Sequence, residues 1–88
     1  MKKLYVLIRA DLSKSQQAVQ AGHAVAEWML HDHAERWRNE TLIYLSTRDE
    51  EELDRWNERL DQIDIAHVSF QEADLEHQTT AIAAYDDG

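Results

Sequence analysis

Residues 3–9 read Lys-Leu-Tyr-Val-Leu-Ile-Arg, an unbroken run of strand-forming residues between two cations. A run without polar alternation is typical of a strand that is covered on both faces of its sheet. Asp11 and Ser13 interrupt it, and Ser13 with Gln16 has the spacing of a capping box. These residues predict a central strand that leads through a short turn into a helix.

The first helix is predicted to run to about His31, because apolar residues recur from Ala18 to Leu30 at helical spacing. Gly22 lies in its middle. A glycine there costs about 1 kcal/mol relative to alanine, so we expect it to mark close packing.

The rest of the chain predicts three more strands and one more helix. The strands are expected at about residues 41–46, 65–70 and 78–85, and the helix at about 49–62. The apolar stripe of that helix is predicted to comprise Leu53, Trp56 and Leu60.

The order of elements, β-α-β-α-β-β, predicts the layers of the fold and the directions of its strands. Strands separated by helices need crossovers that cover the sheet, whereas the last two strands are joined by a short loop, so one of them runs antiparallel to the others. The sequence therefore predicts an α/β fold, a three-layer α/β/α sandwich with a four-stranded mixed sheet, as a single domain over residues 1–88. The first strand and residues 79–85 are expected at the centre, and the third strand at an edge.

The amino-acid composition and the charge distribution exclude several classes of function. The 88 residues have a net charge of −9 and no cysteine, which excludes disulfide and thiol chemistry. Residues 1–48 hold seven basic and five acidic side chains, a net of +2, whereas residues 49–88 hold two and thirteen, a net of −11. A polyanion must therefore approach the N-terminal half. No apolar run is long enough to span a membrane, and we expect a cytoplasmic protein.

Polar side chains line one face of the first helix. Residues spaced by four, three and four positions share a helical face, and here they are Gln16, Gln20, His23 and Glu27. Such a stripe is either the solvated side of a half-buried helix or part of a site. An imidazole in a site can exchange protons near neutral pH, and an amide beside it can orient a water.

Two stretches carry a family resemblance. Residues 4–12 read Leu-Tyr-Val-Leu-Ile-Arg-Ala-Asp-Leu and residues 18–24 read Ala-Val-Gln-Ala-Gly-His-Ala. They resemble the type-2 peptidyl-tRNA hydrolases, whose first strand ends in Arg-x-Asp-Leu and leads into a helix reading Lys-Val-Ala-Ala-Gln-Cys-Ser-His-Ala. Residues 71–74 and 79–83 are similar to the end of that fold. The resemblance implies an α/β/α sandwich, hydrolysis of the ester between a peptide and the tRNA 3′ end without a metal or other cofactor, and often a homodimer.

The resemblance also implies site residues. Gln20 and His23 match the helix motif, and Glu72 matches the acid of the family's Asp-Ala-Gly loop, in which Asp74 replaces the Gly. The expected catalytic residues are therefore His23, Gln20, Glu72 and Asp74. The expected substrate-binding residues are Asp11, Lys14 and Gln16.

This chain departs from the family pattern at two places. Gln16 stands where the family has a Lys, for which Lys14 could substitute from another direction. Residues 72–77 shorten the family's Asp-Ala-Gly-x-Thr-Gln segment, so its Thr has no counterpart. Two hypotheses follow: an esterase acting on peptidyl- or aminoacyl-tRNA, or a catalytically degenerate relative whose acidic helix, residues 49–64, binds a basic protein or regulates one.

Two other motifs allow competing interpretations. His23, Glu27 and His31 have a spacing that could hold a metal, but adjacent turns of one helix rarely complete a site, so we expect none. Trp37 lies between two arginines and could touch RNA, or it could belong to a solvent-facing helix end with ordinary ion pairs.

Overall fold

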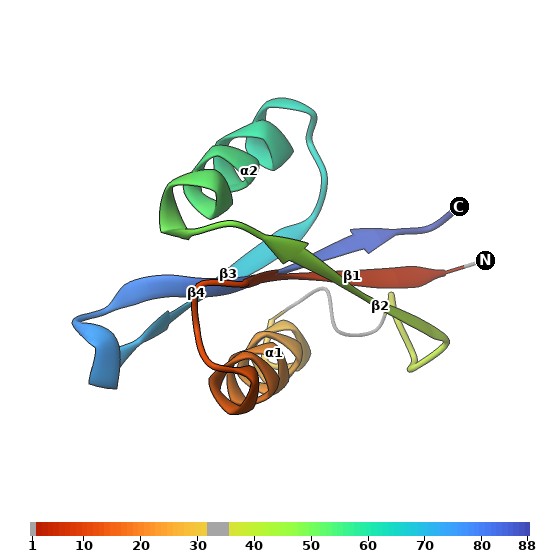
Figure 1. Ribbon diagram of the computed structural model, residues 1–88. Helices are drawn as coiled ribbons and strands as arrows, with labels where there is room; N and C mark the ends of the chain where they lie inside the picture. Colours follow the sequence, from red (N-terminus) through yellow and green to blue (C-terminus); the bar gives the residue numbers. More distant parts are fainter. Residues whose placement is uncertain (1, 32–35) are drawn as a thin grey trace.

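The computed structural model describes residues 2–31 and 36–88. Its elements are β1 Lys3–Arg9, α1 Lys14–Met29, β2 Thr41–Thr47, α2 Glu50–Gln62, β3 His67–Glu72, the 3-10 turn η1 Ala73–Leu75 and β4 Gln78–Asp86. The four strands form one sheet in the order β2-β1-β4-β3, with α1 and α2 on opposite faces (Figure 1). The predicted element order and three-layer sandwich are confirmed.

The sheet is mixed, as predicted. β1 runs parallel to β2 and antiparallel to β4, and β3 runs antiparallel to β4. β1 and β4 are the two central strands and β3 is an edge strand, in agreement with the sequence-based expectation. Because Lys3 pairs with Asp86, the two ends of the chain lie close together at one end of the sheet (Figure 1).

The two faces of the sheet carry separate cores. Alternate residues of a strand point to opposite faces, so Leu4, Val6 and Ile8 pack with Trp28 under α1, whereas Leu7 packs under α2. The small alanines of β4 at 81 and 83 are fully buried on the α1 side. Their size allows the helix to approach the sheet closely.

Both helices begin at capping residues. The Ser13 hydroxyl accepts a hydrogen bond from the Gln16 N–H at 3.2 Å, as the capping-box spacing predicts. The Asp49 carboxylate accepts one from the Glu52 N–H at 2.9 Å. Three glutamates, at 50, 51 and 52, occupy the first turn of α2, where the helix dipole favours negative charge.

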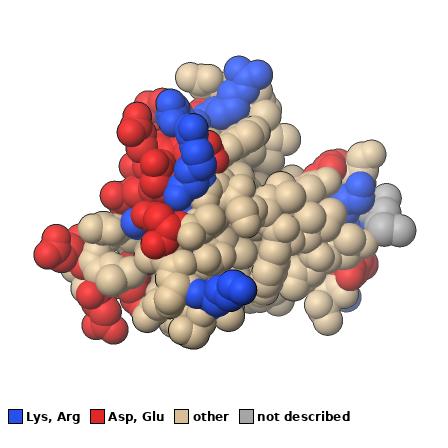
Figure 2. Space-filling model, in the orientation of Figure 1, with Lys and Arg blue, Asp and Glu red and all other residues tan. Residues whose placement is uncertain are grey.

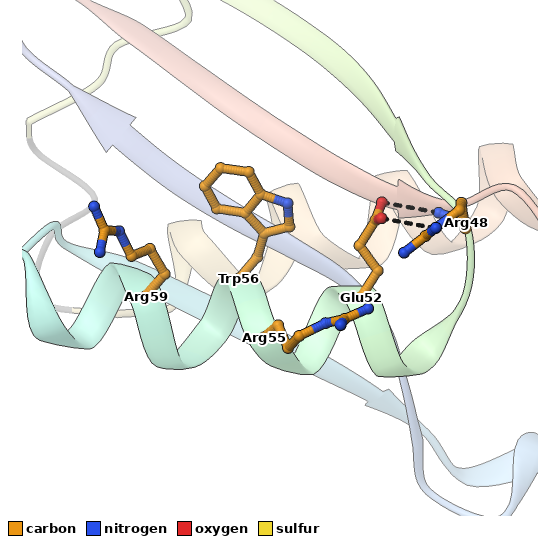
Figure 3. A pocket seen from close by; sticks show the side chains of 5 residues that line it. All are labelled: Arg48, Glu52, Arg55, Trp56 and Arg59. Atoms are coloured by element: carbon orange, nitrogen blue, oxygen red, sulfur yellow. Dashed lines mark hydrogen bonds and ion pairs between the residues drawn. The ribbon is translucent and has the colours of Figure 1, made fainter.

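Three predictions about single residues are wrong. Gly22 marks no close packing, because it is exposed and an added Cβ would meet nothing within 4 Å. Trp56 is not core: its surface is 44% exposed, and it lines a shallow hollow of about 240 Å³ beside three arginines (Figure 3). Trp37 neither faces solvent nor offers a surface for RNA, because it is buried and its Nε1–H donates to the Thr41 carbonyl at 3.0 Å.

Charge is distributed unevenly over the surface. Figure 2 shows acidic side chains gathered over α2 and around the β3–β4 turn, while the middle of the same face carries few charged residues. No helix in the described part of the chain is long and apolar enough to cross a membrane.

Candidate functional site

Gln20 is the centre of a hydrogen-bonded cluster between α1 and the sheet. It is fully buried. Its Oε1 accepts from the Thr80 hydroxyl at 2.6 Å, while its Nε2 donates to Glu72 Oε1 at 3.1 Å and to Gln16 Oε1 at 3.3 Å. An unpaired buried amide would cost about 1–3 kcal/mol, so these partners offset its desolvation. Both ends of the amide are held, which fixes its orientation.

The turn between β3 and β4 brings two of these partners together. Glu72 is the last residue of β3, and Thr80 lies near the start of β4. Between them η1 is followed by Glu76 and His77, both with left-handed backbone at φ 56° and 59°, and the His77 N–H donates to the Glu72 carbonyl at 2.9 Å. The tight turn therefore presents the Glu72 carboxylate and the Thr80 hydroxyl to the same side chain of α1.

His23 lies one helical turn beyond Gln20 and is exposed. Its ring stacks on Phe70, with ring centroids 4.5 Å apart and planes 10° apart. Phe70 precedes Glu72 by two residues on β3, so the His23–Phe70 and Gln20–Glu72 contacts are neighbours along the same pair of elements. Stacking fixes the plane of the imidazole and leaves its two nitrogens at the ring edge.

A second cluster forms around Arg9, at the carboxyl end of β1. This guanidinium is buried and binds Asp11 through two contacts, Nε–Oδ1 at 3.0 Å and Nη2–Oδ2 at 2.9 Å. Its Nη1 also donates to Gln78 Oε1 at 3.0 Å and to the Thr79 carbonyl at 3.3 Å. The hydrogen bonds and charge of the pair lower the pKa of Asp11 and raise the pKa of Arg9. Asp11, expected to bind substrate, is thus a partner of Arg9.

The start of β4 joins the two clusters. Gln78 and Thr79 hold Arg9, and the next residue, Thr80, holds Gln20. The Thr79 N–H also donates to Glu50 Oε2, from α2, at 2.8 Å. The structure therefore brings the loop after β1, the first half of α1 and the β3–β4 turn to the same end of the sheet.

Two expected site residues lie outside these contacts. Lys14 is exposed as the first residue of α1, and Asp74 is exposed in η1. Neither belongs to the two hydrogen-bonded clusters of described residues. That all the expected site residues line one concavity stays a prediction.

Sequence reasoning missed Arg9, Thr80 and Phe70 as parts of the site. Arg9 had a local signal, since it ends an apolar strand and lies two residues before an acid. Thr80 lies in the segment 79–83 that carries the family resemblance, but nothing in the sequence indicated that Thr80 or Phe70 contacts α1, because these contacts depend on how the sheet is assembled.

The metal-type spacing of His23, Glu27 and His31 does not converge on one point. His31 Nε2 lies 3.2 Å from Glu27 Oε2, whereas His23 faces Phe70. Over residues 2–31 and 36–88, no group of three histidine or carboxylate side chains could hold a metal ion.

Comparison with protein families identifies the family of the chain. A family model described as peptidyl-tRNA hydrolase PTH2 matches residues 2–85, which is nearly the whole chain. No curated protein matches the sequence.

Proposed function

Because the chain belongs to the peptidyl-tRNA hydrolase PTH2 family, we propose that it hydrolyses the ester between a peptidyl or aminoacyl group and the 3′ end of tRNA. One observation carries the proposal. Gln20, from the family's helix motif, is buried and hydrogen-bonded to Glu72, 52 positions away, in the segment that resembles the family's acidic loop. Since peptidyl-tRNA arises in translation, a cytoplasmic location follows from this function.

Glu72 is the proposed general base. Gln20 holds its Oε1, so Oε2 is the oxygen that would take a proton from a water as the water attacks the ester carbonyl carbon. Gln20 itself acts as a positioning residue, because its amide is already bonded to three protein groups.

His23 is the proposed partner acid. When the bond between the carbonyl carbon and the ribose oxygen breaks, the leaving oxygen needs a proton, and a protonated imidazole can supply it. The products are a free carboxylic acid and the tRNA hydroxyl, and both side chains return to their starting states by exchange with solvent. Asp74, exposed beside Glu72 in η1, is a second candidate for proton exchange.

Phosphate recognition is assigned to Lys14. Arg9 is buried and already paired with Asp11, so it has no free charge to offer. Lys14 is exposed as the first residue of α1, two residues before Gln16, where the Gln20 cluster begins. Gln16 and Asp11 then contribute by holding Gln20 and Arg9.

The test is the initial rate of ester cleavage on purified peptidyl-tRNA. Glu72→Gln and His23→Ala should each lower kcat by about 10²-fold or more, since general acid–base groups contribute roughly 10²–10⁴-fold. The matched controls are Glu27→Gln and His31→Ala, which break the contact between Glu27 on α1 and His31 just beyond its end and should leave the rate unchanged. Absence of turnover by the wild type at low salt would refute the proposal.

The second candidate function is an acidic binding module. One shallow surface of α2 is mostly acidic: it is lined by Glu50, Glu51, Asp54 and Glu58, together with Arg55 and Asn57. Burial and the nearby Glu50 raise the pKa of Asp54. The carboxylates on this surface therefore repel one another, and a cationic partner would reduce that repulsion. If wild-type protein lacks hydrolysis but binds a Lys- and Arg-rich peptide, and a charge-reversed α2 does not, this function replaces the first.

A further inference from the structure

One side of α2 is cationic and aromatic, although the helix as a whole is acidic. Residues separated by three, four and seven positions share a helical face, and here they are Glu52, Arg55, Trp56 and Arg59. Together with Arg48, which directly follows β2, they line a hollow of about 240 Å³, the Trp56 hollow. In Figure 3 the Trp56 ring projects from α2 toward the strands, with Arg59 on one side and Glu52 and Arg48 on the other.

Two arginines of this hollow have no partner among the described residues. Arg55 and Arg59 are the two basic residues of the acidic half, residues 49–88. Both are exposed, and within residues 2–31 and 36–88 their guanidinium groups make no hydrogen bond and no ion pair. Arg48, by contrast, is held by Glu52, with its Nε 2.9 Å from Oε2. In a chain with 18 acidic and nine basic residues, two guanidinium groups one helical turn apart are thus available to carboxylates of another molecule.

A second hollow adjoins the first on the α2 face of the sheet and shares Trp56 with it. We call it the apolar hollow, because its walls are mainly apolar side chains, among them Tyr5, Leu7, Leu45 and Leu60. Leu45 is 45% exposed and Trp56 is 44% exposed, so apolar surface contacts water here. The volume is about 370 Å³, within the range of roughly 300–1,000 Å³ that is usual for ligand pockets.

We propose that the two hollows bind an acidic segment of a partner protein. One apolar side chain of the segment enters the apolar hollow, while neighbouring carboxylates contact Arg55 and Arg59. Guanidinium groups bind carboxylates through two parallel hydrogen bonds, and the apolar side chain removes Trp56 and Leu45 from water. Trp, Tyr and Arg are the residue types enriched among the residues that contribute most to protein–protein binding, and all three occur here.

The charges around the two hollows favour a short acidic segment over a nucleic acid. Asp86 lines the apolar hollow, and Glu51, Asp54 and Glu58 line the neighbouring surface of α2. A nucleic acid carries a phosphate at every nucleotide, so a strand that follows this surface would bring phosphates against these carboxylates. A peptide segment can place its carboxylates at the arginines alone and an uncharged side chain beside Asp86.

The first test is binding of a labelled, end-blocked peptide, Glu-Asp-Leu-Phe-Glu-Asp, measured by fluorescence anisotropy. Two control peptides keep only the charges, as Glu-Asp-Ser-Ser-Glu-Asp, or only the apolar residues, as Ser-Ser-Leu-Phe-Ser-Ser. We expect saturable binding of the first peptide, about tenfold or more tighter than that of either control. Because Trp28 and Trp37 are buried, a change in tryptophan emission on binding of the unlabelled peptide reports on Trp56. Absence of saturable binding, or equal binding of either control peptide, would overturn the proposal.

The second test uses variants whose folding is checked by circular dichroism. Arg59→Glu and Trp56→Ala should each weaken binding of the acidic peptide by about tenfold or more. The matched control is Arg38→Glu, which makes the same charge change at an exposed position outside both hollows and should leave Kd unchanged. Binding unaffected by Arg59→Glu or by Trp56→Ala contradicts the proposal, and tighter binding of a labelled oligouridylate, lost in Arg59→Glu, would assign the surface to RNA instead. Neither hollow contains a residue of the Gln20 or Arg9 cluster, so these results are independent of the enzymatic proposal.

Discussion

Thr80→Val tests whether the buried cluster around Gln20 serves both stability and catalysis. Valine has nearly the shape of threonine, so the change removes only the hydroxyl that donates to Gln20 Oε1 at 2.6 Å. That oxygen is then buried without its donor, which costs about 1–3 kcal/mol. For a domain of this size each kcal/mol lowers Tm by about 4–8 °C, so we expect a fall of roughly 4–24 °C.

Thr47→Val is the matched control. Thr47 is also buried, and its hydroxyl donates at 3.1 Å to the Ile8 carbonyl, away from Gln20. Both variants should lose stability in thermal unfolding, but only Thr80→Val should lower kcat on peptidyl-tRNA below its own Tm, because Gln20 then holds Glu72 less firmly. Equal turnover by the two variants would refute the positioning role, and an unchanged Tm for Thr80→Val would refute the energetic argument.

Three further predictions concern exposed positions. Gly22→Ala should raise the free energy of unfolding by about 1 kcal/mol in urea titrations, since its Cβ meets nothing within 4 Å; a loss would mean that the glycine has an unseen packing role. Lys14→Ala should raise KM more than it lowers kcat, with a smaller effect at high salt, in initial rates at two salt concentrations; a fall in kcat alone would contradict its assignment to phosphate. The pKa of Asp54 is raised by burial and by Glu50, so its contribution favours folding at acidic pH and is lost as pH rises through that pKa. Asp54→Asn should therefore stabilise the protein by up to about 0.5 kcal/mol at pH 7 and not at pH 3, and equal effects at both pH values would count against this linkage.

The arrangement of the sheet could be predicted from the sequence because the composition of each central strand indicated its position in the sheet. The apolar run from Lys3 to Arg9 and the small residues of β4 both predicted central strands, and the structure confirms both. β3 begins at His67, two residues later than expected from Ile65, which is the usual uncertainty at the end of a strand.

Trp56 was wrongly predicted to be buried because it lies at the side of the apolar stripe of α2 and not at its centre. Leu53 and Leu60 are seven residues apart and differ by about 20° around the helix, whereas Trp56 is displaced from Leu53 by about 60°. Both leucines are buried, while Trp56 lies at the rim of the stripe. Its burial would require α2 to cover more of β2, where Leu45, which lines the same hollow as Trp56, is 45% exposed. No periodicity in α2 could predict how far the neighbouring layer extends.

The two departures from the family pattern act on the same cluster. A lysine at position 16 could only donate hydrogen bonds, whereas Gln16 Oε1 accepts the N–H of Gln20. The shortened 72–77 segment closes through the His77 N–H bond to the Glu72 carbonyl, which brings Glu72 to the other N–H of the same amide. Gln20 donates to both altered segments, so each departure is tied to the other through one side chain. Through this one amide, hydrogen bonds within the protein hold Gln16 and Glu72 together.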